Sequence, residues 1–523
     1  RSSTFCFLFK RRERSLMEGL DVGELLPPSV SACCSCSLFL RCSRCFHSST
    51  AALKEWRPPS NAPCVSRLVE AGAIIVGRAN MCELAVGFSG SSPVHGLCLN
   101  PRNPAINVGG SSSGTAASVA AGIVSCGLGS DTGGSLRGPA ALCGVVGFRP
   151  TRWPRKGVVP VSSLRDTPGP IGACVEDICL LDAVATSTDV VAPKDVTDLK
   201  IGIPRDWLAT APQGLDENAL AALDAASAAL RKSGALVEDV DGFVAVTETN
   251  RETWPVPVLP VPFENNCQDL TTYIESHQDA LGLDVEALRP LDRMERKLYF
   301  ASLDDESLKQ IARRAHCEQA EVLDLLDSIG TLTVSSIQDK VGNPHIRSLF
   351  DTPTVPQEVI DERLGFALDP DRPMAKNLTE LKKWESEERG RRLAVKDEEI
   401  QRVIQEVIGE KMSETKEGCR AMDAAYRAYF AEHNIRCLLL PTFAQPPGSV
   451  NDKGYAAKAF TNEYHWLFHL NEIPIPSITL PTSVVFPGSM IPCSVLLYGL
   501  DDAEVLGIAR TLEVALGGVS DWA

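Results

Sequence analysis

The chain has 523 residues, of which 44% are hydrophobic, and it carries a formal net charge of −16 at pH 7. This length and apolar content can bury a substantial core, so we expect a soluble globular protein. The acidic balance argues against nucleic acid and anionic membranes as partners, because both attract a basic face, and the lack of an apolar run of about 18 residues excludes a membrane-spanning helix.

The first 50 residues are predicted to be an irregular leader, because they show no sustained period of 2 or 3.6 residues. The chain begins at Arg1 and its first methionine is Met17, which favours a start that is not native. The spacing Cys42-x-x-Cys45-x-His47 resembles zinc ligation. No second ligand pair follows at a structural-zinc spacing, so we expect no metal site.

Cysteine usage predicts a reducing compartment. Of the 18 cysteines, those after Cys64 are scattered singly in a chain too long to need disulfide staples. We therefore expect a cytoplasmic protein. Residues 30–54 contain basic residues and serine but no acid, as organelle transit peptides do, so organelle targeting is kept as an alternative.

The expected elements mix helices and strands. Residues 65–76 run from a helix into a β-branched strand, residues 115–124 form a small-residue helix, and short strands are expected at 145–148, 200–203 and 436–440. From about 215 to 435 the sequence is charged and helical. Strands return after residue 471, and an amphipathic helix is expected over 504–516. The pattern predicts an α/β protein with a large mixed sheet.

Two glycine-rich serine turns are the most informative feature of the chain. Residues 109–114 read GGSSSG, residues 130–137 read SDTGGSLR, and the small-residue helix joins them. Glycine permits backbone conformations closed to other residues and lets amide groups point at a developing oxyanion. A serine at the end of such a turn is placed for attack, so the pattern is typical of a serine hydrolase.

Other interpretations of these turns are weaker. Residues 110–114 satisfy the G-x-S-x-G pattern of α/β-hydrolases, with Ser112 as nucleophile. That fold needs a strand directly before the serine, whereas residues 101–108 are loop-like, and none of the eight histidines lies in a recognisable triad setting. A phosphate-binding loop is excluded because no Gly-Lys-Ser/Thr follows the glycines. The simplest structural role for the serines at 111–113 is to cap the helix that follows.

The order of the motifs resembles the amidase signature family, serine hydrolases that cleave carboxamides with a Ser-Ser-Lys triad. The resemblance covers about half of the chain, with mandelamide and indoleacetamide hydrolases as the most similar subgroups. A glutamine-dependent tRNA transamidase subunit belongs to the same family. Besides the serine turns, the resemblance rests on GRANMCEL at 77–84, SPVHG at 92–96, NPRN at 100–103, CGVVGFRPT at 143–151, DTPGP at 166–170 and a weaker match over about 436–516.

The resemblance implies one domain over residues 51–523, with helices on both faces of the sheet and a helical insertion at about 215–435. It implies hydrolysis of a carboxamide to a carboxylic acid and ammonia through an acyl-enzyme. The expected partner is a small-molecule amide, and no metal or organic cofactor is implied. A homo-oligomer is compatible with this assignment.

The resemblance also implies the roles of the turn residues. Ser135 is the expected nucleophile, and Ser111, preceded by a cis peptide bond, is expected to pass protons between Ser135 and a base. The oxyanion hole is expected from the backbone N–H groups of Thr132, Gly133, Gly134 and Ser135.

Further residues have expected supporting roles. Asp131 and Arg137 are predicted to form a partly buried ion pair that fixes the turn. Ser112 is expected to cap the helix or to hydrogen-bond the turn. Ala85 and Phe88 lie where the family lines its acyl pocket, although either could belong to the core.

The family's third catalytic member, a lysine in a short strand, has no counterpart at its usual distance before Ser111. That window falls near residues 31–36, which read SACCSC, and no lysine occurs between Lys10 and Lys54. Lys54 comes too late and is expected at the surface. Without a base a serine hydroxyl is a weak nucleophile, which leaves two hypotheses: an active enzyme whose first 50 residues here are not native, or a pseudoenzyme that binds amides.

Overall fold

The structure is a computed structural model that describes residues 5–8, 60–248, 305–315, 322 and 417–518, except for 83–84, 86, 93–94, 163–164, 212, 451–465, 468–470 and 472. The chain divides into two compact units. The first comprises residues 1–159, 165–249 and 423–523, and the second comprises residues 160–164 and 250–422. The described part of the second unit includes helix α12 (Asp305–Arg314).

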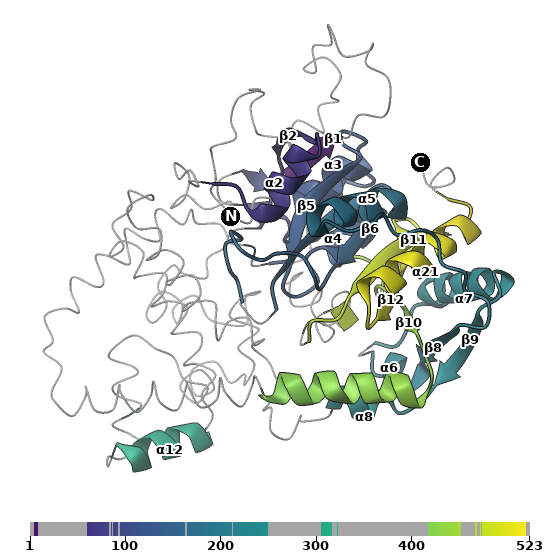
Figure 1. Ribbon diagram of the computed structural model, residues 1–523. Helices are drawn as coiled ribbons and strands as arrows, with labels where there is room; N and C mark the ends of the chain where they lie inside the picture. The colour runs from purple at the N-terminus through teal and green to yellow at the C-terminus, as the bar shows by residue number, and fades with distance from the viewer. Residues whose placement is uncertain are drawn as a thin grey trace, which may run out of the picture. The chain divides into compact units, whose positions relative to one another are not determined.

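A ten-stranded sheet forms the core of the first unit (Figure 1). Most neighbouring strands are antiparallel, whereas β8 pairs in parallel with both β9 and β10, so the sheet is mixed. A separate ribbon joins β3 (Ser91–Ser92) to β4 (Gly96–Leu97). In spatial order the strands of the large sheet are β2 (Ile74–Arg78), β1 (Phe5–Leu8), β5 (Cys126–Asp131), β7 (Thr167–Gly172), β6 (Val146–Arg149), β11 (Ser477–Val485), β12 (Pro492–Gly499), β10 (Cys437–Pro441), β8 (Lys200–Pro204) and β9 (Leu236–Val240).

The interior strands are buried on both faces. Every residue of β6, β7, β10 and β12 is buried, which explains why apolar residues run continuously in sequences such as CLLLP at 437–441. The terminal strands β2 and β9 leave side chains such as Ile74 and Leu236 exposed. Burial therefore increases from the edges of the sheet toward its interior strands.

Helices cover both faces of the sheet. Helices α3 and α4 contact each other, whereas α5 contacts α2 and α21, and α21 contacts α7. Strands β6, β7 and β11 each contact a helix from both sets, so the two sets lie on opposite faces (Figure 1). The predicted α/β class and the flanked mixed sheet are confirmed. The helices of the first unit are α2 (Pro63–Glu70), α3 (Ser113–Ala120), α4 (Arg137–Cys143), α5 (Val175–Thr186), α6 (Arg205–Leu208), α7 (Glu217–Lys232), α8 (Phe243–Glu248), α21 (Asp502–Ala515) and part of a helix over residues 417–432.

The predicted local elements agree with the structure where it describes them. The strands expected at 145–148, 200–203 and 436–440 are β6, β8 and β10, and the helices expected at 115–124 and 504–516 are α3 and α21. In the predicted helical insertion at about 215–435, the described residues form strand β9 as well as helices, and most of the insertion (249–304, 316–321 and 323–416) lies outside the described residues. The prediction that the first 50 residues are irregular is wrong for residues 5–8, because backbone pairing with β2 and β5 makes them strand β1. The other leader residues lie outside the described residues.

In the described part of the chain, no helix has the length and apolar character needed to cross a membrane.

Candidate active site

The two serine turns lie side by side. The backbone N–H of Ser112 donates to the carbonyl oxygen of Ser135 at 3.4 Å. The Ser112 hydroxyl donates to the carbonyl oxygen of Ser130 and accepts from the N–H of Ser130, both at 3.3 Å. A Cβ at Gly129 would lie 2.4 Å from Ser112 Oγ, so glycine in β5 permits this approach. Three hydrogen bonds of 3.3–3.4 Å thus connect the first turn to the second.

The expected capping role of Ser112 is not observed. Ser112 occupies the N-cap position of α3, but its side chain makes no capping hydrogen bond. The hydroxyl is instead engaged by Ser130, the last residue but one of β5. The Ser112 hydroxyl therefore hydrogen-bonds the second serine turn, which is the alternative role expected from the sequence.

Ser111, the first serine of the first turn, is buried. The Gly110–Ser111 peptide bond is cis, as the resemblance implies. The Ser111 carbonyl oxygen accepts from the N–H of Cys82 at 3.1 Å. The Ser111 hydroxyl is buried and has no hydrogen-bond partner among the described residues. Since a buried hydroxyl normally has a partner, Ser111 Oγ is suited to a proton-transfer or substrate contact.

Ser135 lies between a glycine turn and the first residue of α4. Gly134 has φ of 108°, a conformation that L-residues with side chains rarely adopt, so glycine is needed directly before the serine. Ser135 itself is 5% exposed. The turn therefore holds its serine at a nearly buried position beside Ser112.

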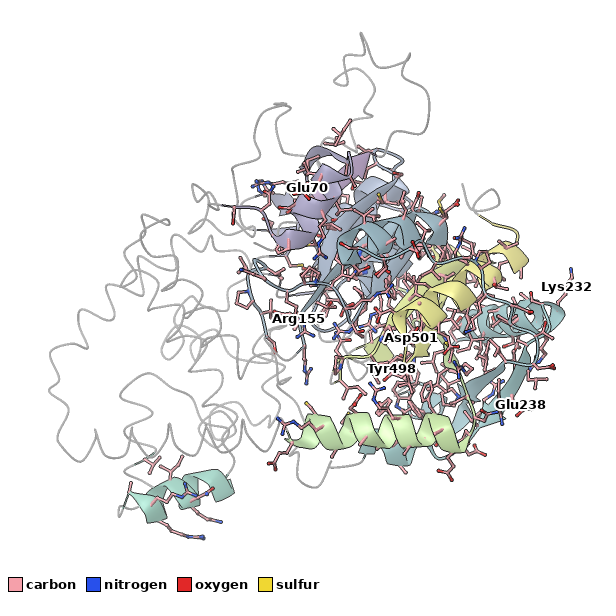
Figure 2. The ribbon with its side chains drawn as sticks, in the orientation of Figure 1. Glu70, Arg155, Lys232, Glu238, Tyr498 and Asp501 are labelled. Carbon is pink, nitrogen blue, oxygen red and sulfur yellow. The ribbon has the colours of Figure 1, made fainter. Side chains whose placement is uncertain are left out.

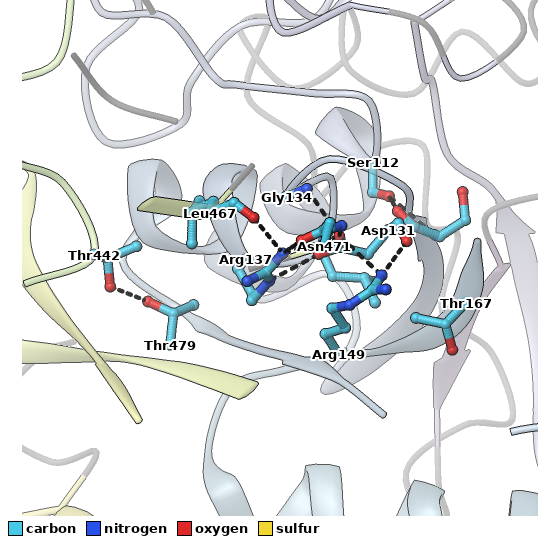
Figure 3. A network of polar contacts seen from close by, with 12 residues as sticks. Ser112, Asp131, Gly134, Arg137, Arg149, Thr167, Thr442, Leu467, Asn471 and Thr479 are labelled. Carbon is cyan, nitrogen blue, oxygen red and sulfur yellow. Dashed lines mark hydrogen bonds and ion pairs between the residues drawn. The ribbon is translucent and has the colours of Figure 1, made fainter. Parts of the chain in front are cut away.

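A buried charge network holds the second turn (Figure 3). Arg137 Nε donates to Asp131 Oδ2 at 3.0 Å, and both side chains are fully buried. Arg149 in β6 reaches the same carboxylate at 3.3 Å, and Asn471 Nδ2 donates to it at 2.6 Å. The expected Asp131–Arg137 pair is present, but it is completely buried, because strand β6 and the chain near Asn471 cover it.

The network keeps Asp131 ionised. Burial alone would raise the pKa of the Asp131 carboxyl, but the charges of Arg137 and Arg149, with hydrogen bonds from Arg137 and Asn471, hold it well below its usual range. Burial lowers the pKa of Arg149 to about 10, and Asp131 opposes that shift. At neutral pH Asp131 and Arg149 are therefore charged, so they orient the turn and do not transfer protons.

Some backbone N–H groups of the second turn already donate to Asp131, and others have no acceptor among the described residues. The N–H of Gly134 donates to Asp131 Oδ1 at 2.8 Å, and the N–H of Leu136 donates to Asp131 Oδ2 at 3.2 Å. The expectation that Gly134 donates to an oxyanion is therefore corrected, because Asp131 already occupies its N–H. The N–H groups of Thr132, Gly133 and Ser135 have no acceptor among the described residues. These amides are the available donors for an oxyanion.

A second carboxylate contacts the same turn. The Thr132 hydroxyl donates to Asp166 Oδ1 at 2.5 Å. Asp166 directly precedes β7, and its side chain is buried. Asp166 thus binds the turn at Thr132, and Asp131 binds it at Gly134.

The loop after β2 lies against the first turn. The N–H of Ala85 donates to the carbonyl oxygen of Cys82, whose own N–H binds Ser111. Ala85 is 7% exposed and has a positive φ of 64°, a strained conformation that is frequent at functional sites. Phe88 is half-buried in the same loop. The expectation that Ala85 and Phe88 line an acyl pocket stays a prediction.

None of the described lysines of the first unit is bonded to Ser111. Lys194 pairs with Glu504 at 2.7 Å and Lys200 with Glu238 at 2.8 Å. Lys156 is exposed, and Lys232 points outward at the end of α7 (Figure 2). The lysines at 10 and 54 lie outside the described residues.

The alternatives from the sequence gain no support. The residues of the zinc-like pattern lie outside the described part, and the part that the structure describes contains no group of three or more His, Cys, Asp or Glu suited to a metal. Between β4 and α3 the described chain contains no strand, so Ser112 lacks the setting of an α/β-hydrolase nucleophile.

Sequence reasoning missed three polar residues of the site. Arg149 and Asp166 lie in the motifs at 143–151 and 166–170, but their pairing with the turn depends on how β6 and β7 align with β5. Asn471 lies 340 positions after Asp131. The only indication in the sequence was that Asn471 is a polar residue in a largely apolar stretch before β11.

Comparison with known proteins identifies the sequence around this site. Residues 46–256 match the family model described as Amidase. This part of the chain belongs to the amidase family. The matched region contains both serine turns, the loop after β2, Arg149 and Asp166.

Two kinds of amidase relative match at similar identity. A glutamyl-tRNA(Gln) amidotransferase subunit of Anaeromyxobacter dehalogenans is 42% identical over 208 residues, covering 36% of this chain and 41% of that protein. Indoleacetamide hydrolase of Allorhizobium ampelinum is 46% identical over 158 residues, covering 30% of this chain and 34% of that protein. The matches span about two-fifths or less of these relatives, and they do not separate the two amidase subgroups.

Solved amidase structures share the fold. The corresponding glutamyl-tRNA(Gln) amidotransferase subunit of Thermotoga maritima aligns with a TM-score of 0.55 at 19% identity, covering 89% of this chain and 79% of that one. The peptide amidase of Stenotrophomonas maltophilia aligns with a TM-score of 0.54 at 21% identity, covering 91% and 80%. These alignments extend the amidase fold beyond the region matched in sequence.

Proposed function

We propose that the chain is an amidohydrolase that converts a small carboxamide to a carboxylic acid and ammonia through an acyl-enzyme on Ser135. The observation that carries the proposal is the joined pair of serine turns within the amidase-family region, with Ser135 beside amides that have no acceptor among the described residues. Metal and organic cofactors have no role in the proposed reaction.

In the proposed first half-reaction, Ser135 Oγ attacks the carbonyl carbon of the amide. Its proton passes to Ser111 and from there to a base. The carbonyl oxygen becomes an oxyanion, which accepts hydrogen bonds from the N–H groups of Thr132, Gly133 and Ser135. The intermediate then collapses, the C–N bond breaks, and ammonia leaves with the returned proton.

In the second half-reaction, water attacks the acyl ester and releases the acid. Ser111 again carries the proton, and Ser135 recovers its hydroxyl. Asp131, Arg137 and Asp166 hold the turn during both steps, and Ser112 joins it to the first turn. The base that Ser111 requires is not identified among the described residues.

The proposed substrate class includes aryl-acetamides, because indoleacetamide hydrolases are among the similar proteins. We further propose a reducing compartment such as the cytoplasm, which is supported by the free and mostly buried cysteines of the described chain. Association into homo-oligomers stays a prediction.

The test is ammonia release by the full chain from a panel of primary amides that includes indole-3-acetamide, benzamide, propionamide and glutamine. Ser135→Ala and Ser111→Ala should each lower release at least about 1,000-fold, because the serines act as one unit. Ser227→Ala is the control. Ser227 is a buried serine of α7 that bonds Leu223, outside the proposed site, so its variant should retain turnover.

Two results would contradict the proposal. A Ser135→Ala variant that releases ammonia at the rate of the unsubstituted chain would exclude Ser135 as nucleophile. If the unsubstituted chain binds amides yet releases no ammonia, the chain is the pseudoenzyme that the sequence left open.

A further inference from the structure

We infer that Asn471 is a positioning residue of the nucleophile turn, an inference that rests on the proposed function for its kinetic consequences. Asn471 is fully buried. It lies outside the region matched by the amidase family model. Its side chain connects the chain before β11 to the charge network beside Ser135 (Figure 3).

The Asn471 amide joins an anion to a cation. Its Nδ2 donates to Asp131 Oδ1 at 2.6 Å, and its Oδ1 accepts from Arg137 Nη2. The reversed amide would place a donor against the guanidinium and an acceptor against the carboxylate, so the two partners fix its orientation. An amide satisfies both at once, which neither a carboxylate nor an apolar side chain can do.

The position of Asp131 determines the position of the turn. Its carboxylate accepts from the N–H groups of Gly134 and Leu136, which flank Ser135. A displacement of this carboxylate therefore shifts the backbone on both sides of the serine. Because reacting groups must be held to within a fraction of an ångström, a bond that restrains Asp131 acts on the reaction through the turn.

Residues 466 and 467, shortly before Asn471, connect the charge network to an aromatic cluster outside the turn. The carbonyl oxygen of Leu467 accepts from Arg137 Nη2 at 3.2 Å. The preceding Trp466 is fully buried and packs against Trp207, with 4.9 Å between the ring centroids. Through Phe243 the same aromatic cluster reaches Tyr426. Leu467 and Asn471 therefore both bind the charge network, and Leu467 directly follows a tryptophan that belongs to this cluster.

Two substitutions of Asn471 distinguish its hydrogen bond to Asp131 from its hydrogen bond to Arg137. Asn471→Leu removes both, whereas Asn471→Asp keeps an acceptor for Arg137 but loses the donor to Asp131. If Asn471 positions the turn through Asp131, both variants should lower kcat by about 10- to 100-fold, with KM changed no more than about threefold. Amide hydrogen exchange in a peptide spanning residues 130–137 should become about tenfold faster in both.

Asn103→Leu is the matched control, because Asn103 donates to the Ser489 carbonyl oxygen at 3.1 Å outside the network. It should leave kcat and exchange at residues 130–137 unchanged. The inference is overturned if exchange there is unchanged in both Asn471 variants, or if kcat is retained although exchange accelerates. If the unsubstituted chain releases no ammonia, the proposed function fails separately, and hydrogen exchange alone decides whether Asn471 positions the turn.

Discussion

The carboxylate of Asp131 is where the nucleophile turn, strand β6 and the chain before β11 meet. Arg137 and Arg149 both bind it, so two buried guanidinium groups share one anion. Arg137 Nη1 and Arg149 Nε are buried and have no partner among the described residues. Asp166, which contacts the same turn through Thr132, is a second carboxylate near Arg149, so the two cations face two anions.

Replacing Asp131 should destabilise the fold strongly. Asp131→Asn leaves the guanidinium groups of Arg137 and Arg149 buried without a carboxylate, and breaking such a pair typically costs about 3–5 kcal/mol. The free energy of unfolding from urea denaturation measures this loss. Asp423→Asn, which breaks an Asp–Arg pair of 2.9 Å between partly exposed side chains, should cost no more than about 1 kcal/mol. Equal losses in the two variants would show that burial of the Asp131 network contributes little.

At the scale of elements, Glu513 joins the last helix to α5. Its Oε1 accepts from the N–H of Val175 at 2.9 Å, at the first residue of α5. The N-cap residue Cys174 makes no side-chain capping bond, so a carboxylate from α21 supplies the acceptor that this helix end requires. Since α5 contacts β6 and β7, this cap supports the strands that carry Arg149 and follow Asp166.

This cap should make stability depend on pH. Burial raises the pKa of Glu513 from 4.5 to about 7, although the Val175 N–H and Arg510 oppose the shift. Because the folded pKa exceeds the unfolded one, the contribution of Glu513 to stability is fully present below about pH 4.5 and is lost as pH rises through about 7.

Glu513→Gln keeps an acceptor for Val175 and removes the titration. Relative to this variant, the unsubstituted chain should lose roughly 2 kcal/mol of unfolding free energy between about pH 4.5 and pH 7. Urea denaturation at several pH values measures the difference, with Glu217→Gln on the exposed side of α7 as control. Parallel stability curves for the chain and Glu513→Gln would contradict the assigned cause.

At the scale of the whole molecule, the glycine turns and the buried strands could be predicted from the local sequence alone. Glycines marked the turns around Ser111 and Ser135, and continuous apolar runs marked buried strands such as β10. The bonds from Arg149 and Asn471 to Asp131 could not be predicted, because they depend on strand alignment and on a contact between distant parts of the chain. The predicted oxyanion role of the Gly134 N–H was wrong, because this N–H donates to the Asp131 carboxylate. The sequence alone does not show where that carboxylate lies.

The proposed reaction depends most on Ser135 being the nucleophile. The direct measurement is labelling of the full chain with a fluorophosphonate, whose fluoride is displaced by an activated serine oxygen, followed by mass spectrometry of the peptides. We predict a phosphonyl adduct on Ser135 that is absent from Ser135→Ala. An adduct on Ser112, or no adduct on any serine of residues 109–137, would contradict the account.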